Sequence, residues 1–173
     1  VTAGVYLIAR TNVIFELAPD ARLIVAIVGT VTLLIAGFSA LVQHDLKRAL
    51  AYSTISQIGY MFLALGVSGW EAGVFHFMTH AFFKALPFLG AGVIIEALAD
   101  EHDIFKMGGL RGPMKTTFVT YLLGAAALAG VVPFAGFWSK DEILLSAWHQ
   151  HAYGPFALTM VASFLTAFYM TRQ

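Results

Sequence analysis

The stretch GVFHFMTHAFFKALPFLGAGVII, residues 73–95, decides the fold class of this chain. It is long enough to cross a bilayer as a helix, which takes about 20 mostly apolar residues. Within it, His76, His80 and Lys84 follow one another at intervals of four residues and therefore share one face of that helix. A charged side chain at the centre of a bilayer costs about 2.5–3.5 kcal/mol. The stretch predicts a membrane helix whose protonatable groups serve a function.

The composition of the whole chain also indicates a membrane protein. Hydrophobic residues make up 59% of the 173 positions, charged residues only 12%, and the mean hydropathy is +0.78. Soluble domains carry about twice that charged fraction. The formal net charge is zero, so no basic surface indicates a nucleic-acid partner. The chain contains no cysteine, which excludes disulfides and cysteine-ligated iron–sulfur clusters within it.

Hydrophobic segments recur along the chain at helical length. We expect an all-α, polytopic transmembrane bundle of about five to six helices, forming a single domain over residues 1–173. The expected segments are residues 1–15, 23–42, 46–67, 72–98, 116–148 and 156–171. No region shows the alternating segments of roughly ten residues that are typical of a transmembrane barrel. Both ends are apolar, and we interpret the chain as a fragment of a larger polypeptide.

The basic residues divide unequally when the loops are alternated across the membrane. Arg10 and Arg22 fall on one side. The other side receives Lys47, Arg48, Lys106, Arg111, Lys115 and Arg172. The positive-inside rule places this second side in the cytoplasm. Lys84 and Lys140 remain inside the membrane.

The fifth segment contains a helix break in GVVPFAGFWSKDE, residues 130–142. Pro133 removes a backbone donor, and the freed carbonyls need partners in lipid. Transporters use such interrupted helices to build ion sites near the bilayer midplane. A kink without function is the alternative, but Lys140, Asp141 and Glu142 just after the proline favour a functional break. Whether the two carboxylates neutralise Lys140 or face water stays open.

The protonatable line on residues 72–98 is typical of a proton relay. Burial favours the neutral form of a lysine, and histidine changes charge near neutral pH. Steps of four residues advance a helix by about 6 Å, whereas direct proton transfer requires about 3 Å. Waters or hydroxyls must therefore bridge the steps. Thr79 and the hydroxyl-rich residues 52–56 are candidates.

Other roles of these polar residues compete with a proton relay. His76, His80 and Lys84 could each merely hydrogen-bond a neighbouring helix. Haem ligation is disfavoured, because two ligands four residues apart on one helix cannot lie on opposite haem faces. A zinc site of the HExxH type is disfavoured too, because the intervening residues include no carboxylate. Lys47 can be a positive-inside anchor at a helix start, with Asp45 as the N-cap of that helix.

Four motifs together identify a family resemblance. They are LVQHDLKRALAYSTISQIGYMFLALG (41–66), FHFMTHAFFKALPFLGAGVI (75–94), IFKMGGL (104–110) and GFWSKDEIL (136–144). In this order they resemble the proton-conducting membrane transporter family, the antiporter-like subunits of NADH-quinone oxidoreductase, respiratory complex I. The last two motifs favour the L-type subunits over the paralogous M and N types. Mrp-type sodium/proton antiporters share much of the pattern and are the alternative.

The resemblance implies roles for particular residues. Lys140 matches the family's proton-switching lysine at the broken helix. His76, His80 and Lys84 match the central polar axis, and Lys47 matches a further proton-transfer lysine. The family fold has two inverted five-helix repeats, of which this chain covers the end of the first and most of the second.

The resemblance also implies the setting of the chain. It would be a subunit of a proton-translocating NADH:quinone oxidoreductase, a translocase driven by distant redox chemistry. No cofactor is expected in this chain, while the parent complex uses FMN, iron–sulfur clusters and quinone. The expected partners are other membrane subunits, including a paralogous antiporter-like subunit, and the lipid bilayer. The expected location is the bacterial plasma membrane, or the inner mitochondrial membrane if the protein is organellar. A structural subunit with inert buried contacts is the competing hypothesis.

Overall fold

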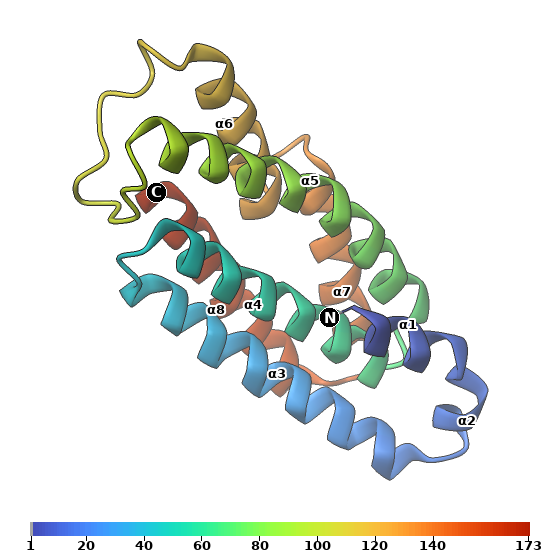
Figure 1. Ribbon diagram of the computed structural model, residues 1–173. Coiled ribbons are helices and arrows are strands. Elements are labelled where there is room, and N and C mark those ends of the chain that lie inside the picture. Colours follow the sequence, from blue (N-terminus) through green and yellow to red (C-terminus); the bar gives the residue numbers. More distant parts are fainter. Residues whose placement is uncertain (1) are drawn as a thin grey trace.

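The computed structural model describes residues 2–173, and its regular elements are all α-helices. They are α1 (Ala3–Arg10), α2 (Asn12–Glu16), α3 (Pro19–Val42), α4 (Leu46–Gly66), α5 (Trp70–Ala97), α6 (Lys115–Ala129), α7 (Ala135–His149) and α8 (Tyr153–Arg172) (Figure 1). The predicted all-α class is confirmed. The described residues form more helices than expected, because residues 1–15 divide at Thr11 and residues 116–148 divide after Ala129.

Three helices are long and apolar enough to cross a membrane, namely α3, α5 and α8, with 24, 28 and 20 residues. Helix α4 has 21 residues but carries more polar side chains, most of them facing inward. Helices α6 and α7 have 15 residues each, so each is only about 22 Å long. That is shorter than a hydrocarbon core of about 30 Å.

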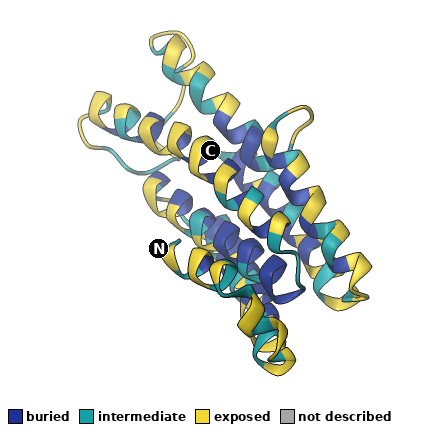
Figure 2. Ribbon diagram, turned by 90° about the vertical axis from the view of Figure 1, so that its right-hand side faces the viewer, coloured by how far each residue is buried: buried dark blue, intermediate teal, exposed yellow. Residues whose placement is uncertain are grey.

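Helix α4 lies at the centre of the bundle. It packs on α3 through small residues: a Cβ on Gly59 would clash with Leu33, and one on Gly29 would clash with the backbone of α4. Such close approach of backbones is how helices associate in lipid without a hydrophobic driving force. Figure 2 shows buried residues gathered inside the bundle and exposed residues on its outer faces. Polar side chains on α4 are therefore enclosed by neighbouring helices.

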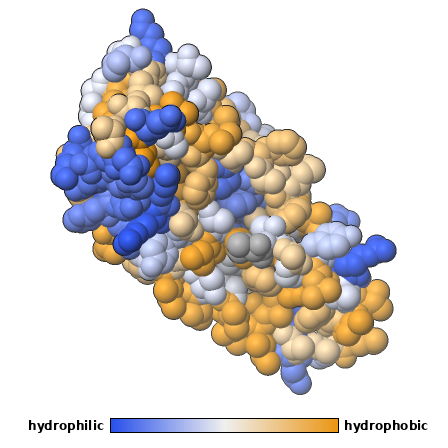
Figure 3. Space-filling view, in the orientation of Figure 1, coloured by the Kyte–Doolittle hydropathy of each residue, from blue (hydrophilic) through white to orange (hydrophobic). Residues whose placement is uncertain are grey.

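The loops predicted to share one side of the membrane meet at one end of the bundle. The amide of Leu46 donates to the carbonyl of His102 at 3.0 Å, and the amide of Ile104 donates to the carbonyl of His44 at 2.9 Å. The Arg172 guanidinium adds a 2.6 Å bond to the Gln43 carbonyl. Figure 3 shows hydrophilic side chains concentrated at this end, with mostly hydrophobic surface along the body of the molecule.

The break between α6 and α7 has a defined geometry. Helix α6 ends at Ala129, and Gly130 has φ +83°, a left-handed conformation that favours glycine. Helix α7 starts at Ala135 with Gly136 packed on α6, where a Cβ would overlap the Ala127 carbonyl oxygen. The missing side chain at Gly136 thus lets α7 begin directly against the end of α6.

Candidate functional site

Four of the five predicted site residues are buried in the bundle. The exposed fractions are 0% for His76, 5% for His80, 5% for Lys84 and 4% for Lys140. Helix α5 supplies the first three at the predicted spacing, and α7 supplies the fourth. The two helices pack against each other, so the structure brings residues separated by the whole α5–α6 loop into one interior region.

His76 is hydrogen-bonded on both ring nitrogens. Its Nδ1 lies 2.9 Å from the Ser139 hydroxyl of α7, and its Nε2 lies 3.2 Å from the amide oxygen of Gln57 on α4. Ser139 is the residue before Lys140. His76 therefore connects the central helix of the bundle with the helix that begins after the break.

Lys84 is held by a hydroxyl. Its ammonium donates a 2.8 Å hydrogen bond to the Ser53 hydroxyl of α4, which also accepts a 2.9 Å bond from Tyr169 of α8. The Nζ atom also lies 5.5 Å from the centre of the Phe88 ring. An uncharged hydroxyl can hold either the charged or the neutral form of a lysine, because it can both accept and donate.

Lys140 is held by the helix break itself. The last carbonyls of a helix have no amide partner within that helix. Lys140 uses one of them, donating to the Leu128 carbonyl of α6 at 2.6 Å, and its Nζ lies 5.4 Å from the centre of the Tyr60 ring. The close contact at Gly136, four residues earlier on the same face of α7, permits this approach. The broken helix thus provides the acceptor for the lysine that follows it.

His80 lies between these better-bonded groups. Its ring centre is 6.2 Å from that of His76 and 5.6 Å from that of Phe83. Its Nε2 is buried and has no hydrogen-bond partner among the described residues. A buried polar atom without a protein partner is a position where water would form the missing bond.

Lys47, the fifth predicted residue, does not join this group. It lies exposed in the first turn of α4, at the end of the bundle where the polar loops meet. Asp45 is the N-cap of α4, as the sequence suggested, and accepts a 2.9 Å bond from the amide of Arg48. Any proton-transfer role of Lys47 stays a prediction.

The hydroxyl bridges differ in part from those expected. Ser53 contacts Lys84, but Thr79 donates to the His76 carbonyl within its own helix at 3.2 Å. Sequence reasoning missed Gln57, Thr166 and Tyr169. Gln57 and Tyr169 both contact the Thr166 hydroxyl, at 3.5 and 3.4 Å. The four-residue spacing of Ser53 and Gln57 on an apolar helix was the available signal.

The interior site lacks nearby negative charge in the part of the chain that the structure describes. Its buried polar residues are threonines, serines, Gln57, the two histidines and the two lysines. Asp141 and Glu142 are exposed, and neither forms an ion pair with Lys140. Among residues 2–173, no group of three or more metal-ligating side chains comes together.

Opposite charges instead pair in the α5–α6 loop. Lys106 lies 3.1 Å from Glu101. The backbone N–H of Asp103, and then the Lys106 side chain, hold the pKa of Glu101 below its usual value. Glu101 in turn raises the pKa of Lys106.

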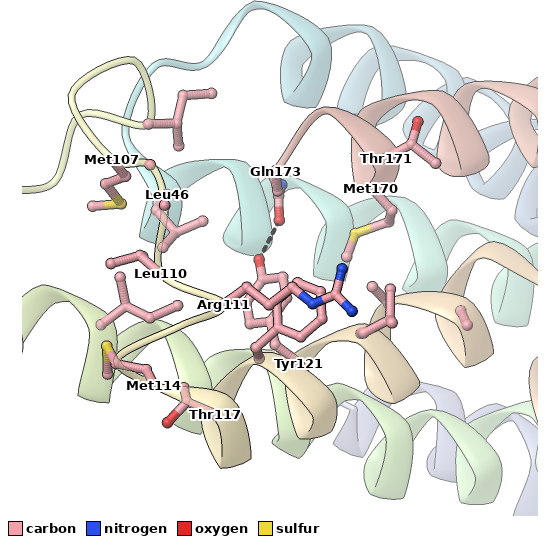
Figure 4. Close-up of a pocket in the computed structure, with 18 of the residues that line it drawn as sticks. Leu46, Met107, Leu110, Arg111, Met114, Thr117, Tyr121, Met170, Thr171 and Gln173 are labelled. Carbon is pink, nitrogen blue, oxygen red and sulfur yellow. Dashed lines mark hydrogen bonds between the residues drawn. The ribbon is translucent and has the colours of Figure 1, made fainter.

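A cavity of about 590 Å³ lies apart from the buried lysines and histidines. The α5–α6 loop, α6 and the end of α8 line it mainly with apolar side chains, and Tyr121 donates a 2.6 Å bond to Gln173 (Figure 4). It contains none of the predicted site residues.

Both the sequence and the fold are similar to those of known membrane proteins. Residues 1–166 match the family model described as NADH:quinone oxidoreductase/Mrp antiporter, TM. The chain is 55% identical over 174 residues to NADH-quinone oxidoreductase subunit L of Escherichia coli (strain K12), a match covering 100% of this chain and 28% of that protein. The Pseudomonas aeruginosa subunit L is 57% identical over 177 residues, a match covering 99% of this chain and 28% of that protein.

Two solved structures share the fold. One is the Mrp complex from Dietzia sp. DQ12-45-1b, with TM-score 0.90, 29% identity, and coverage of 97% of this chain and 32% of that chain. The other is the membrane-bound sulfane sulfur reductase, an archaeal respiratory membrane complex, with TM-score 0.90, 36% identity, and coverage of 99% and 36%.

Proposed function

The chain belongs to the NADH:quinone oxidoreductase/Mrp antiporter transmembrane family, and from this premise we propose that it is part of a proton-translocating subunit of NADH-quinone oxidoreductase. It spans about 28% of the length of the curated subunits L that it matches, so the activity belongs to a larger assembly. The redox chemistry, with FMN, iron–sulfur clusters and quinone, takes place elsewhere in that assembly. This chain supplies part of the proton path.

One observation carries the proposal. Lys84 and Lys140 are buried, and each donates to a neutral oxygen rather than to a carboxylate. A fixed carboxylate would hold a lysine in its charged form, whereas a hydroxyl or a carbonyl leaves proton loss possible. Lysines that can change charge inside a bilayer are what proton transfer requires.

The path runs along α5 and onto α7. A proton passes between Lys84 and Lys140 by way of His80 and His76, with water bridging gaps that exceed hydrogen-bonding distance. The ring centres of the two histidines are 6.2 Å apart, which leaves room for such a bridge. Changes in neighbouring subunits alter the relative proton affinity of the two lysines and so drive net movement.

The setting follows from the same proposal. The complete subunit has an inverted-repeat fold, sits in the bacterial plasma membrane, and contacts a paralogous antiporter-like subunit. The loop end, which carries the excess of basic residues, faces the cytoplasm. Lys47 is exposed at that end, which supports proton exchange with a neighbouring subunit rather than with the buried line.

The test replaces Lys140 with Met in the full-length subunit within the complete complex. Proton pumping by inverted membrane vesicles is measured together with NADH oxidation and complex assembly. We expect pumping to fall at least about tenfold while the complex assembles, because the isosteric side chain cannot carry a proton. The exposed Lys115→Met change is the matched control and should pump normally. Normal pumping by Lys140→Met would contradict the proposal.

A second candidate is a subunit of an Mrp-type sodium/proton antiporter. The similarity to the Mrp complex structure, with TM-score 0.90 over 97% of this chain, favours it. It predicts sodium-dependent proton exchange in vesicles without NADH. Proton pumping that requires NADH and is independent of sodium would exclude it.

A further inference from the structure

The second bond of His76, to Gln57 on α4, raises a question that the proton path leaves open. A neutral imidazole carries one ring proton, so one nitrogen donates and the other accepts. Which nitrogen accepts decides from which side His76 takes up a proton. The neighbours of Gln57 determine the answer.

The argument starts at Thr166 on α8. Its hydroxyl oxygen lies 2.8 Å from the carbonyl oxygen of Ala162 in the same helix. Two oxygens at that distance share a proton, and a carbonyl has none to give. The Thr166 proton is therefore committed to Ala162, and the Thr166 oxygen is left as an acceptor.

The amide of Gln57 is oriented by this acceptor. Its nitrogen makes a long contact of 3.5 Å with the Thr166 oxygen, an acceptor toward which only the N–H end of the amide can point, and its carbonyl oxygen lies 3.2 Å from His76 Nε2. An amide oxygen only accepts hydrogen bonds. Nε2 of His76 must therefore carry the ring proton. All three side chains are buried at 0% exposure, so water does not compete for these bonds.

We propose that Gln57 is a positioning residue that keeps the proton of neutral His76 on Nε2, so that His76 exchanges protons only at Nδ1, the nitrogen that faces Ser139 of α7. This inference rests on the proposed proton-transfer function. Nδ1 then accepts the 2.9 Å bond from the Ser139 hydroxyl, whose other contact, to the Gly136 carbonyl, is long at 3.5 Å.

The proton balance follows directly. Ser139 passes its hydroxyl proton to Nδ1 of His76 and takes one at the same oxygen from the Lys140 side, directly or through water. His76 becomes an imidazolium that keeps its Nε2 proton bonded to Gln57, and Gln57 neither gains nor loses a proton. His76 later releases the proton from Nδ1, through water, toward His80. His76 thus takes up and releases its proton at one ring nitrogen, and Gln57 keeps the other nitrogen out of the exchange.

The ring tautomer can be measured without any mutation. The full-length subunit, labelled with ¹⁵N-histidine and reconstituted in lipid, distinguishes protonated from unprotonated ring nitrogens by solid-state NMR. The His76→Gln variant assigns the signal. We expect the Nε2–H tautomer at a pH where His76 is neutral. An Nδ1–H tautomer in the unmodified protein would overturn the proposal.

Variants test the cause of the tautomer. Gln57→Met, which keeps the volume but removes the acceptor, should populate the Nδ1–H form and reduce pumping at least about tenfold. Thr166→Val should shift the tautomer in the same direction, and Thr166→Ser should restore it, because serine keeps the acceptor. An unchanged tautomer in assembled Gln57→Met would refute the role of Gln57.

The two proposals fail separately. If Lys140→Met pumps normally, the proton path itself is wrong. If Lys140→Met is inactive while Gln57→Met pumps normally with the Nε2–H tautomer, only the positioning role is wrong.

Discussion

The bundle interior and the α5–α6 loop hold their ionisable side chains in opposite ways. In the loop, Lys106 lies 3.1 Å from Glu101; Lys106 is exposed and Glu101 is partly exposed. In the interior, Lys84 meets a serine hydroxyl and Lys140 meets a backbone carbonyl. Opposite charges fix the ionised state, whereas neutral partners satisfy the hydrogen bonds and leave the charge free to change. The loop pair therefore suits fixed charges, and the interior suits the proton exchange proposed above.

The largest effect is expected when a buried lysine is given a carboxylate partner, as Lys106 has in the loop. Ser53→Asp places a carboxylate beside Lys84, where the hydroxyl now lies at 2.8 Å. The new ion pair should hold Lys84 protonated, and we expect pumping in vesicles to fall at least about tenfold with the complex assembled. Ser53→Thr keeps the hydroxyl and should pump normally. Unimpaired pumping in Ser53→Asp would mean that the neutral partner is unimportant.

A second test moves α7 away from the interior acceptor. Gly136→Ala forces a Cβ against the Ala127 carbonyl oxygen. We expect a loss of about 1–3 kcal/mol in the free energy of unfolding, as for other overpacked sites, together with reduced pumping. Gly154→Ala is the control, because a Cβ there meets nothing within 4 Å. Thermal unfolding of the purified full-length subunit measures the stability of both variants. Equal unfolding midpoints for Gly136→Ala and Gly154→Ala would contradict the close packing at Gly136.

Substitutions at the end of the bundle where the polar loops meet should have weaker effects. Asp45→Ala removes the N-cap of α4 and the 3.4 Å contact with His102. The expected loss is about 1 kcal/mol in the free energy of unfolding, which is typical of a capping residue. Glu96→Ala is the control and should have little effect, because Glu96 is exposed and forms no ion pair among residues 2–173. Proton pumping should persist in both variants, since neither carboxylate belongs to the buried line.

The smallest effect is the pH dependence of the loop pair. The pKa of Glu101 is lowered, so its contribution is complete above its ordinary value of 4.5 and is lost as pH falls through the lower folded value. The pKa of Lys106 is raised, so its contribution is complete below 10.5 and is lost as pH rises beyond that. The protection of the amides of residues 101–106, that is, their exchange rate relative to the intrinsic rate at the same pH, should be highest between these limits. Glu101→Gln should flatten the profile.

The sequence predicted that three side chains of α5 share one face of that helix, and the structure places all three inside the bundle. His76, His80 and Lys84 share a face because helical spacing alone places them there. Lys47 was predicted as a site residue mainly from the family resemblance, and it lies exposed in the first turn of α4.

The neutral partners required the tertiary structure. Gln57 and Thr166 lie 109 positions apart in the chain, and Ser53 and Tyr169 lie 116 apart. Hydroxyl and amide side chains are frequent in membrane helices, so nothing in the sequence alone distinguishes a partner of a proton carrier from a helix contact.

The bond from Lys140 to the Leu128 carbonyl has a consequence for how the site can change over generations. A side-chain acceptor is lost with a single codon change, but a peptide carbonyl is present whatever residue occupies position 128. Substitutions at position 128 leave the acceptor atom in place, so the acceptor side of this hydrogen bond tolerates changes in sequence. The substitutions that would disturb this contact are instead those at Gly130 and Gly136, which set the course of the backbone. A side chain would be strained at Gly130 and would clash at Gly136.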